Sequence, residues 1–152
     1  MFDASTIQEQ LTIALVETLE TMAFLAPMPV DGEPAAPERA MLVRICFSGP
    51  TSGRIDLVAA PAVGQALATN MLGLSTDEAC AMEDVARDAL KELMNVLCGA
   101  VLRQTPSGGA GYEMQIPDAS AFDVQGHWAT FIATPGAVVL DADGSTIAVR
   151  MT

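Results

Sequence analysis

The fold is decided by the stretch Asp88-Ala89-Leu90-Lys91-Glu92-Leu93-Met94-Asn95, which continues as Val96-Leu97-Cys98-Gly99. Its apolar side chains recur every three or four residues, as they do along one side of a helix. The stripe consists of Leu90, Leu93, Leu97 and Val101. The stretch therefore predicts a helix that docks one side on a hydrophobic core.

The opposite side of this helix carries a polar row, made of Asp88, Glu92, Asn95 and Gly99. The first three stand at i, i+4 and i+7, on one helical face, and the glycine follows one turn later. A carboxylate can pair with a lysine, a carboxamide can orient a water molecule, and glycine allows close approach to the backbone. The row suits a hydrolysis in which the substrate supplies its own electrophile and metal. From spacing alone, such a row is more often simply the solvated face of a surface helix.

The composition predicts one compact domain over residues 1–152. Hydrophobic residues make up 51% of the chain, which suffices for a full core without disulfides. The cysteines are odd in number and widely spaced, so we expect free buried thiols in a reducing compartment at Cys46, Cys80 and Cys98. With one histidine, His127, the chain lacks the spacing of a zinc site, so we expect no metal and no cofactor of its own.

The net charge of −12 argues against a nucleic-acid partner, because Lys91 is the only lysine and a basic footprint is missing. An anionic membrane surface is disfavoured for the same reason. The apolar stretch 11–30 contains Glu17 and Glu20, so it is too polar to span a bilayer. The first residues lack the positive segment of a secretory signal. We expect a cytoplasmic protein.

Predicted helices and strands occur in separate runs along the chain. Helices are predicted over 6–25, 61–72 and from 75 or 76 to 104, and strands over 40–47, 54–60, 112–116, 127–134, 137–140 and 146–151. Gly73 closes the second helix, and Ser75 with Glu78 has the pattern of a capping box. Residues 31–37 predict a surface loop, 105–111 a glycine-rich connector and 141–144 a turn. The order predicts an α+β two-layer sandwich with a largely antiparallel sheet.

The first predicted helix contains a faint echo of the polar row. Residues 14–20 resemble residues 89–95, with Glu17 in the place of Glu92 and Glu20 in the place of Asn95. Such echoes also arise from chance or from shared helical amphipathicity.

The run Asp88-x-x-x-Glu92-x-x-Asn95, with 21 residues between Asn95 and Pro117, resembles the signature of the CheC/CheX/FliY family. These proteins are phosphatases of the chemotaxis response regulator CheY. The resemblance extends to the order of elements over most of the chain. Because only the second long helix has both Glu and Asn, the chain looks closest to CheX.

The resemblance implies a CheC-like, pseudo-duplicated fold with long helices packed on one side of the sheet, and a homodimer. It implies that Asn95 orients the water that attacks a receiver's aspartyl phosphate, and that Glu92 pairs with the receiver's lysine. Asp88 and Gly99 would make further contacts with this partner. Mg²⁺ is expected on the receiver and not on this chain.

Two alternatives stay open. The chain could be a non-catalytic module that binds a receiver, or a regulatory partner such as the deamidase CheD. It could also be a structural domain of the flagellar switch, although that fold relative lacks the Glu and Asn pair that Glu92 and Asn95 supply here.

Overall fold

The computed structural model describes residues 3–30, 32–75, 77–78 and 83–152. Its sheet has the strand order β1-β6-β7-β3-β2-β4, and β5 pairs with β2 beside β4. The helices are α1 (Ala4–Met22), α2 (Pro61–Leu72), α4 (Glu83–Arg103) and α5 (Val124–Ile132). The strands are β1 (Pro27–Pro29), β2 (Ala40–Ser48), β3 (Gly53–Ala59), β4 (Glu113–Met114), β5 (Asp118–Phe122), β6 (Val138–Ala142) and β7 (Ser145–Met151).

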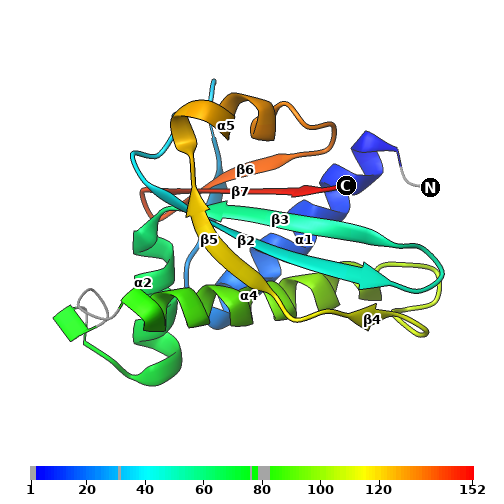
Figure 1. The fold of residues 1–152 in the computed structure, drawn as a ribbon, viewed down its shortest axis with the longest axis horizontal. Helices are drawn as coiled ribbons and strands as arrows, with labels where there is room; N and C mark the ends of the chain where they lie inside the picture. The colour runs from blue at the N-terminus through cyan, green and yellow to red at the C-terminus, as the bar shows by residue number, and fades with distance from the viewer. Residues whose placement is uncertain (1–2, 31, 76, 79–82) are drawn as a thin grey trace.

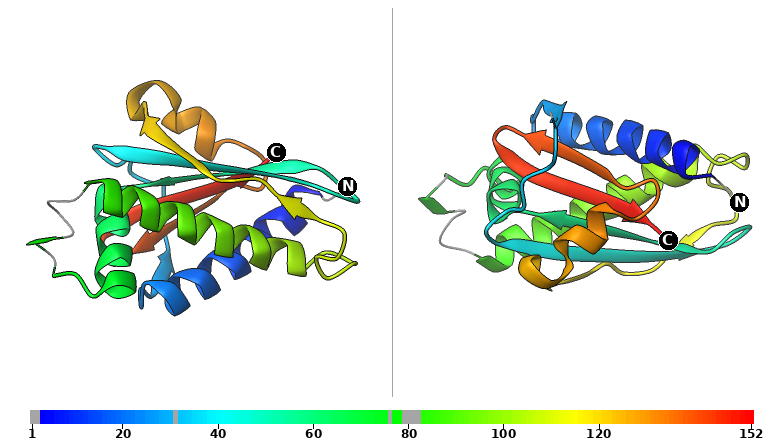
Figure 2. Two further views of the ribbon diagram at one scale, coloured as in Figure 1. Left: turned by 60° about the horizontal axis from the view of Figure 1, so that its bottom comes forward. Right: turned by 90° about the horizontal axis from the view of Figure 1, so that it is seen from above.

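The helices lie on two sides of the sheet (Figures 1 and 2). α1, α2 and α4 cover one face, and α5 lies on the other. All strand pairs are antiparallel. The predicted α+β architecture with long helices on one side is therefore confirmed, and α5 adds a partial third layer.

The two halves of the chain enter the sheet in the same way. Each half gives a long helix, an outer strand and a hairpin: α1, β1 and β2–β3 in the first, α4, β5 and β6–β7 in the second. Each outer strand pairs with the other half's hairpin, β1 with β6 and β5 with β2. The central pair, β3 with β7, joins the halves. This exchange makes the strand order symmetric about that pair, as expected for a pseudo-duplicated fold.

Local sequence signals account for most helix ends. The carboxylate of Asp3 accepts a 2.8 Å hydrogen bond from the Thr6 amide at the start of α1. α2 begins at Pro61 and ends before Gly73, whose φ of 66° is left-handed. The predicted bounds of α2 are thus confirmed, whereas α1 ends at Met22, earlier than the predicted residue 25.

The predicted capping pair is also present. The Glu78 amide donates to Ser75 Oγ over 3.2 Å, and the Ser75 hydroxyl donates to the Glu78 carboxylate over 3.1 Å. Thr76 and residues 79–82, including Cys80, lie outside the described residues. The long predicted helix is described as α4 from residue 83 to 103.

One predicted strand is wrong: residues 127–134 belong mostly to the helix α5. Asp123 caps this helix by accepting a hydrogen bond from the Gly126 amide. Val124, Trp128 and Phe131 recur at helical spacing, and the last two are buried against Val58 and Ala148 on the sheet. The aromatic and β-branched composition suggested a strand, but the helical period decided the structure.

The short strands at the edges of the sheet differ from the sequence prediction. β1 was not predicted, and β5 was missed because Asp-Ala-Ser-Ala-Phe has low strand propensity. Pairing with residues 40–44 of β2 makes β5 a strand. The predicted strand 112–116 shrinks to Glu113–Met114. The predicted turn is confirmed, with Asp143 and Gly144 at positive φ between β6 and β7.

A buried carboxylate joins the three central strands on the face that carries α5. Asp56 is 1% exposed, and its oxygens accept hydrogen bonds from Arg44 Nε at 2.7 Å and Arg150 Nε at 3.1 Å. Arg54 Nε lies 3.5 Å away. Because a buried carboxylate without partners is costly, this cluster fixes the register of β2, β3 and β7.

Two further properties of the structure are the state of its cysteines and the hydropathy of its helices. Cys46 and Cys98 are free thiols, the second buried and the first half-buried. Burial raises the pKa of Cys98 to about 11, so this thiol stays protonated. Among the described residues, no helix has the length and apolar character needed to cross a membrane.

Candidate functional site

The polar row is held in place by the most deeply anchored helix of the fold. α4 packs against α1, α2 and the strands β2 and β5. The predicted stripe is confirmed, because Leu90, Leu93, Leu97 and Val101 are all at most 2% exposed. Close packing with α2 leaves no room at Gly64, where an added Cβ would lie 3.0 Å from the Ala86 carbonyl. The helix is therefore a rigid support for whatever its outer side carries.

The structure places the four predicted site residues on that outer side. Asp88 and Glu92 are exposed, and Asn95 and Gly99 are half-buried. Because successive members are three or four residues apart, they form one continuous line along the helix. The sequence prediction of a shared face is thus confirmed in geometry, while the roles of the residues stay predictions.

The functional groups of the row have no partner within the described part of the chain. The ion pairs found there all involve Asp56, and the side-chain hydrogen bonds at this end of α4 come from Gln104 and Thr105. The Glu92 carboxylate and the Asn95 carboxamide are therefore available to another molecule. Glu92 has no cation three or four residues away along the helix, whereas Asp88 has Lys91 at i+3.

Gly99 is not required by the fold. It is helical, and a Cβ built on it would meet only Arg103 Nη1, at an ordinary 3.5 Å. Glycine costs helix stability relative to alanine, so its presence here calls for another reason. The backbone at the end of the polar row is left open here, as the predicted role of Gly99 requires.

The first half of the fold presents a related but altered face. Glu17 and Glu20 are exposed on α1, at the positions that correspond by a shift of 75 residues to Glu92 and Asn95. The echo thus falls on α1, the helix that takes in the first half of the chain the place that α4 takes in the second. This half has a second carboxylate where α4 has a carboxamide.

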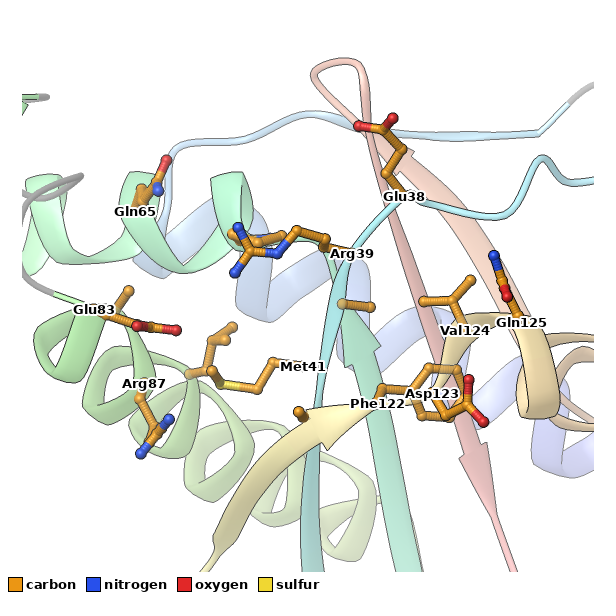
Figure 3. Close-up of a pocket in the computed structure, with 15 residues that line it drawn as sticks. Glu38, Arg39, Met41, Gln65, Glu83, Arg87, Phe122, Asp123, Val124 and Gln125 are labelled. Carbon is orange, nitrogen blue, oxygen red and sulfur yellow. The ribbon is translucent and has the colours of Figure 1, made fainter.

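A separate cavity of about 510 Å³ lies beside the N-terminal half of α4, between α2, β2, β5 and α5 (Figure 3). None of the polar-row residues lines it. Its charged lining consists of Arg39, Arg87, Glu38, Glu83 and Asp123. With three acids and two bases, this lining has mixed charge. The cavity does not follow from the sequence, because its walls come from five separate elements.

Groups of three or more His, Cys, Asp or Glu side chains that could hold a metal ion do not occur among the described residues. Pro117, the last residue of the recognised motif, is buried directly before β5. The strand β5 that follows it packs against α4.

Comparisons with known proteins agree with this geometry. The family model described as "Chemotaxis phosphatase CheX" matches residues 41–121, which include α4 and the whole polar row. The match covers more than half of the chain, so the chain belongs to the CheX family. A search of curated proteins gives no match.

Solved structures share the fold at low sequence identity. A chemotaxis protein CheX from Desulfovibrio desulfuricans superposes with a TM-score of 0.68 at 18% identity, covering 96% of this chain and 97% of that one. CheX from Vibrio vulnificus gives 0.66 at 15% identity, covering 94% and 97%. The CheX–CheY–BeF3–Mg²⁺ complex from Borrelia burgdorferi gives 0.62 at 16% identity, covering 95% of each chain.

Proposed function

We propose that this member of the CheX family binds a phosphorylated CheY-like receiver domain through the polar row and stimulates hydrolysis of its aspartyl phosphate. The observation that carries the proposal is the unpartnered pair of Glu92 and Asn95 on the outer side of a firmly packed helix. Family membership supports the reaction class. The Borrelia relative, solved with CheY, BeF3 and Mg²⁺, supports the kind of partner.

Phosphoryl transfer leaves a protein mainly the tasks of positioning and charge placement. In the proposed reaction, a water oxygen attacks the phosphorus in line, and the bond from phosphorus to the receiver's aspartate breaks. Inorganic phosphate leaves, and the receiver's carboxylate is restored. The Asn95 carboxamide, which can both donate and accept hydrogen bonds, bonds this water and holds it in line. A carboxamide is too weak a base to take the proton, which passes to a phosphate oxygen.

The remaining residues of the row would hold the receiver. The Glu92 carboxylate pairs with the receiver's lysine, and Asp88 adds a contact near the rim. Gly99 lets a loop of the receiver approach the α4 backbone. The Mg²⁺ that neutralises the phosphoryl charge belongs to the receiver, so the proposal requires no cofactor on this chain.

The decisive experiment measures loss of aspartyl phosphate from a panel of phosphorylated receivers of the same cell, with and without this protein. Acceleration for one receiver supports the proposal. Tight binding to a phosphoryl-mimic complex without acceleration for any receiver would contradict hydrolysis and leave a binding module. If neither acceleration nor binding is found for any receiver, receivers are not the partners of the polar row.

We expect Gly99→Ala to have opposite effects on stability and on receiver binding. Alanine is the better helix former and fits the available space, so the free energy of unfolding should rise by about 0.5–1 kcal/mol. The added methyl group should weaken the receiver complex. Denaturant unfolding and titration with a phosphoryl-mimic receiver measure the two effects.

The matched control is Gly64→Ala in α2, which should lower stability because its methyl group would crowd Ala86. Unchanged receiver affinity in Gly99→Ala would show that the partner does not approach this backbone.

We expect the double substitution Glu17→Ala and Glu20→Ala to leave the phosphatase rate nearly unchanged. A carboxylate at position 20 cannot donate a hydrogen bond, and its charge would repel the phosphoryl group. Circular dichroism verifies folding, and the rate is compared with that of the wild type. A loss as large as that of an Asn95 variant would mean that the protein has two active faces.

We also propose that the protein is cytoplasmic and forms a homodimer. Of the two outer edges of the sheet, β1 is protected by Pro27 and Pro29, which lack amide donors. The outer edge of β5 has no such protection and suits pairing with a second copy. Light scattering coupled to gel filtration measures the mass, and a monomeric mass at micromolar concentration contradicts this part.

A further inference from the structure

The outer side of α1 carries Ile13, Glu17 and Glu20, and Phe24 follows two residues past the end of the helix. These four residues are here called the α1 row. Its members have the same spacing as the polar row of α4, shifted by 75 residues. The row differs in chemistry, because its two ends are large hydrophobic side chains. Ile13 is 49% exposed and Phe24 is 79% exposed. The α1 row is therefore an acidic centre between two exposed apolar anchors.

Phe24 is unusual in its conformation as well as in its exposure. Its φ of 52° lies in the left-handed region, where helix ends normally place glycine. The local backbone is held there, since the Leu25 amide donates to the Leu19 carbonyl and the Asn70 side chain donates to the Ala23 carbonyl. The phenyl ring contributes little burial to the fold. A strained and exposed aromatic residue is typical of an interaction site.

The charges of the α1 row indicate the nature of the partner. α1 contains no lysine or arginine, and in the described chain its glutamates form no ion pairs. A second copy that docked isologously would bring the same acids together, which is unfavourable. A receiver docked as proposed for α4 is disfavoured as well, because Glu20 stands in the place of the Asn95 carboxamide. A different, basic partner complements this surface.

We propose that the α1 row is a docking surface for a basic amphipathic helix of another protein. Ile13 stands nine residues before Met22, roughly 14 Å along the helix, and Phe24 follows just past the end of α1. A partner helix that packs nearly parallel to α1 presents two apolar residues at that spacing on one face. Lysine or arginine side chains between them face Glu17 and Glu20. This surface is separate from the polar row, so the inference does not depend on the proposed phosphatase activity.

The test uses a fluorescent synthetic peptide of roughly 18 residues with high helix propensity. It carries two leucines eleven residues apart, with lysines four and seven residues after the first leucine. A scrambled peptide of equal composition is the comparison. We expect the patterned peptide to bind at least about tenfold tighter than the scrambled one, since anchors and charges then meet their partners together.

Variants of the chain then locate the binding. Phe24→Ser and Ile13→Ser should each lower the affinity for the patterned peptide to the affinity for the scrambled one. Ile116→Ser removes a side chain that is 92% exposed elsewhere, and should leave binding unchanged. The double reversal Glu17→Lys and Glu20→Lys should abolish binding. The control Glu33→Lys and Glu38→Lys makes the same change in net charge at other exposed positions and should keep the preference for the patterned peptide.

Several results would overturn the proposal. Equal affinity for both peptides, or unchanged affinity in Phe24→Ser, would mean that only net charge attracts them. A change of oligomeric mass in Phe24→Ser would identify the α1 row as a contact between copies of this chain. Phe24→Gly removes the ring and relieves the left-handed strain, so it provides a folded variant if Phe24→Ser is unstable.

Discussion

Substitution of Asn95 by alanine is expected to remove the stimulated dephosphorylation of the receiver, with a loss on the order of 10²-fold or more. Asn95 is half-buried in the middle of the polar row, and its carboxamide has no hydrogen-bond partner within the described residues. Truncation removes the group that we propose to orient the water and leaves the buried stripe of α4 intact. The measurement is the rate of aspartyl-phosphate loss at saturating concentrations of the variant.

Two controls separate chemistry from structure and from binding. Alanine is a better helix former than asparagine, so Asn95→Ala should unfold at the same or a slightly higher denaturant concentration. Val96→Ala truncates the neighbouring side chain, which is 37% exposed, and should retain the wild-type rate. Asn95→Asp keeps the size but adds a charge that repels the phosphoryl group, so it should be inactive. An Asn95→Ala protein that binds and hydrolyses like the wild type would refute the mechanism.

The central features of the fold could be predicted because local signals and tertiary packing agree there. In α4 the apolar stripe and the polar row are both visible from spacing, and the structure buries the first and exposes the second. α2 has its proline at the first turn and its glycine just after the last, so its bounds follow from the residues themselves. The turn at Asp143 and Gly144 is equally local.

The elements that failed depend on distant partners. β5 is a strand because β2 offers it an edge, and nothing in Asp-Ala-Ser-Ala-Phe indicates this. The segment that forms α5 is rich in aromatic residues, as strands often are. The burial of Trp128 and Phe131 is explained only by their contact with the sheet face opposite α4. Asp56 could have been noticed as a charge within an apolar strand. Its arginine partners, however, come from β2, β3 and β7 and cannot be paired from sequence.

The site itself was predictable in position and not in reactivity. Spacing places Asp88, Glu92 and Asn95 on one face, and burial of the opposite stripe turns that face to solvent. The symmetric strand order adds information that residue spacing does not contain. It makes the two halves of the chain correspond, so that α1 matches α4 and the echo at Glu17 and Glu20 has a structural origin. The partners of the two helix faces are identified by experiments on their complexes.

Glu92→Lys is expected to weaken receiver binding strongly, since it sets a cation against the receiver's lysine that we propose as the partner of Glu92. Loss of a docked charge pair costs about 2–5 kcal/mol, and reversal costs at least as much. The dissociation constant should therefore rise by about 30-fold to several thousand-fold. Glu92 is exposed and makes no ion pair in the described structure, so the variant should fold normally. Titration with a phosphoryl-mimic receiver measures the change.

A charge swap distinguishes a direct pair from a general effect of charge. If Glu92 contacts the receiver's lysine, replacing that lysine by glutamate should restore part of the affinity for Glu92→Lys, and the double-mutant cycle should give a clear coupling energy. Glu83→Lys, in the first turn of the same helix, makes an equal change of net charge away from the row and should alter affinity far less. The loss should also persist at high salt, because screening acts mainly on exposed, distant charges. Unchanged affinity in Glu92→Lys would place this carboxylate outside the interface, and the receiver would then have to dock elsewhere on the molecule.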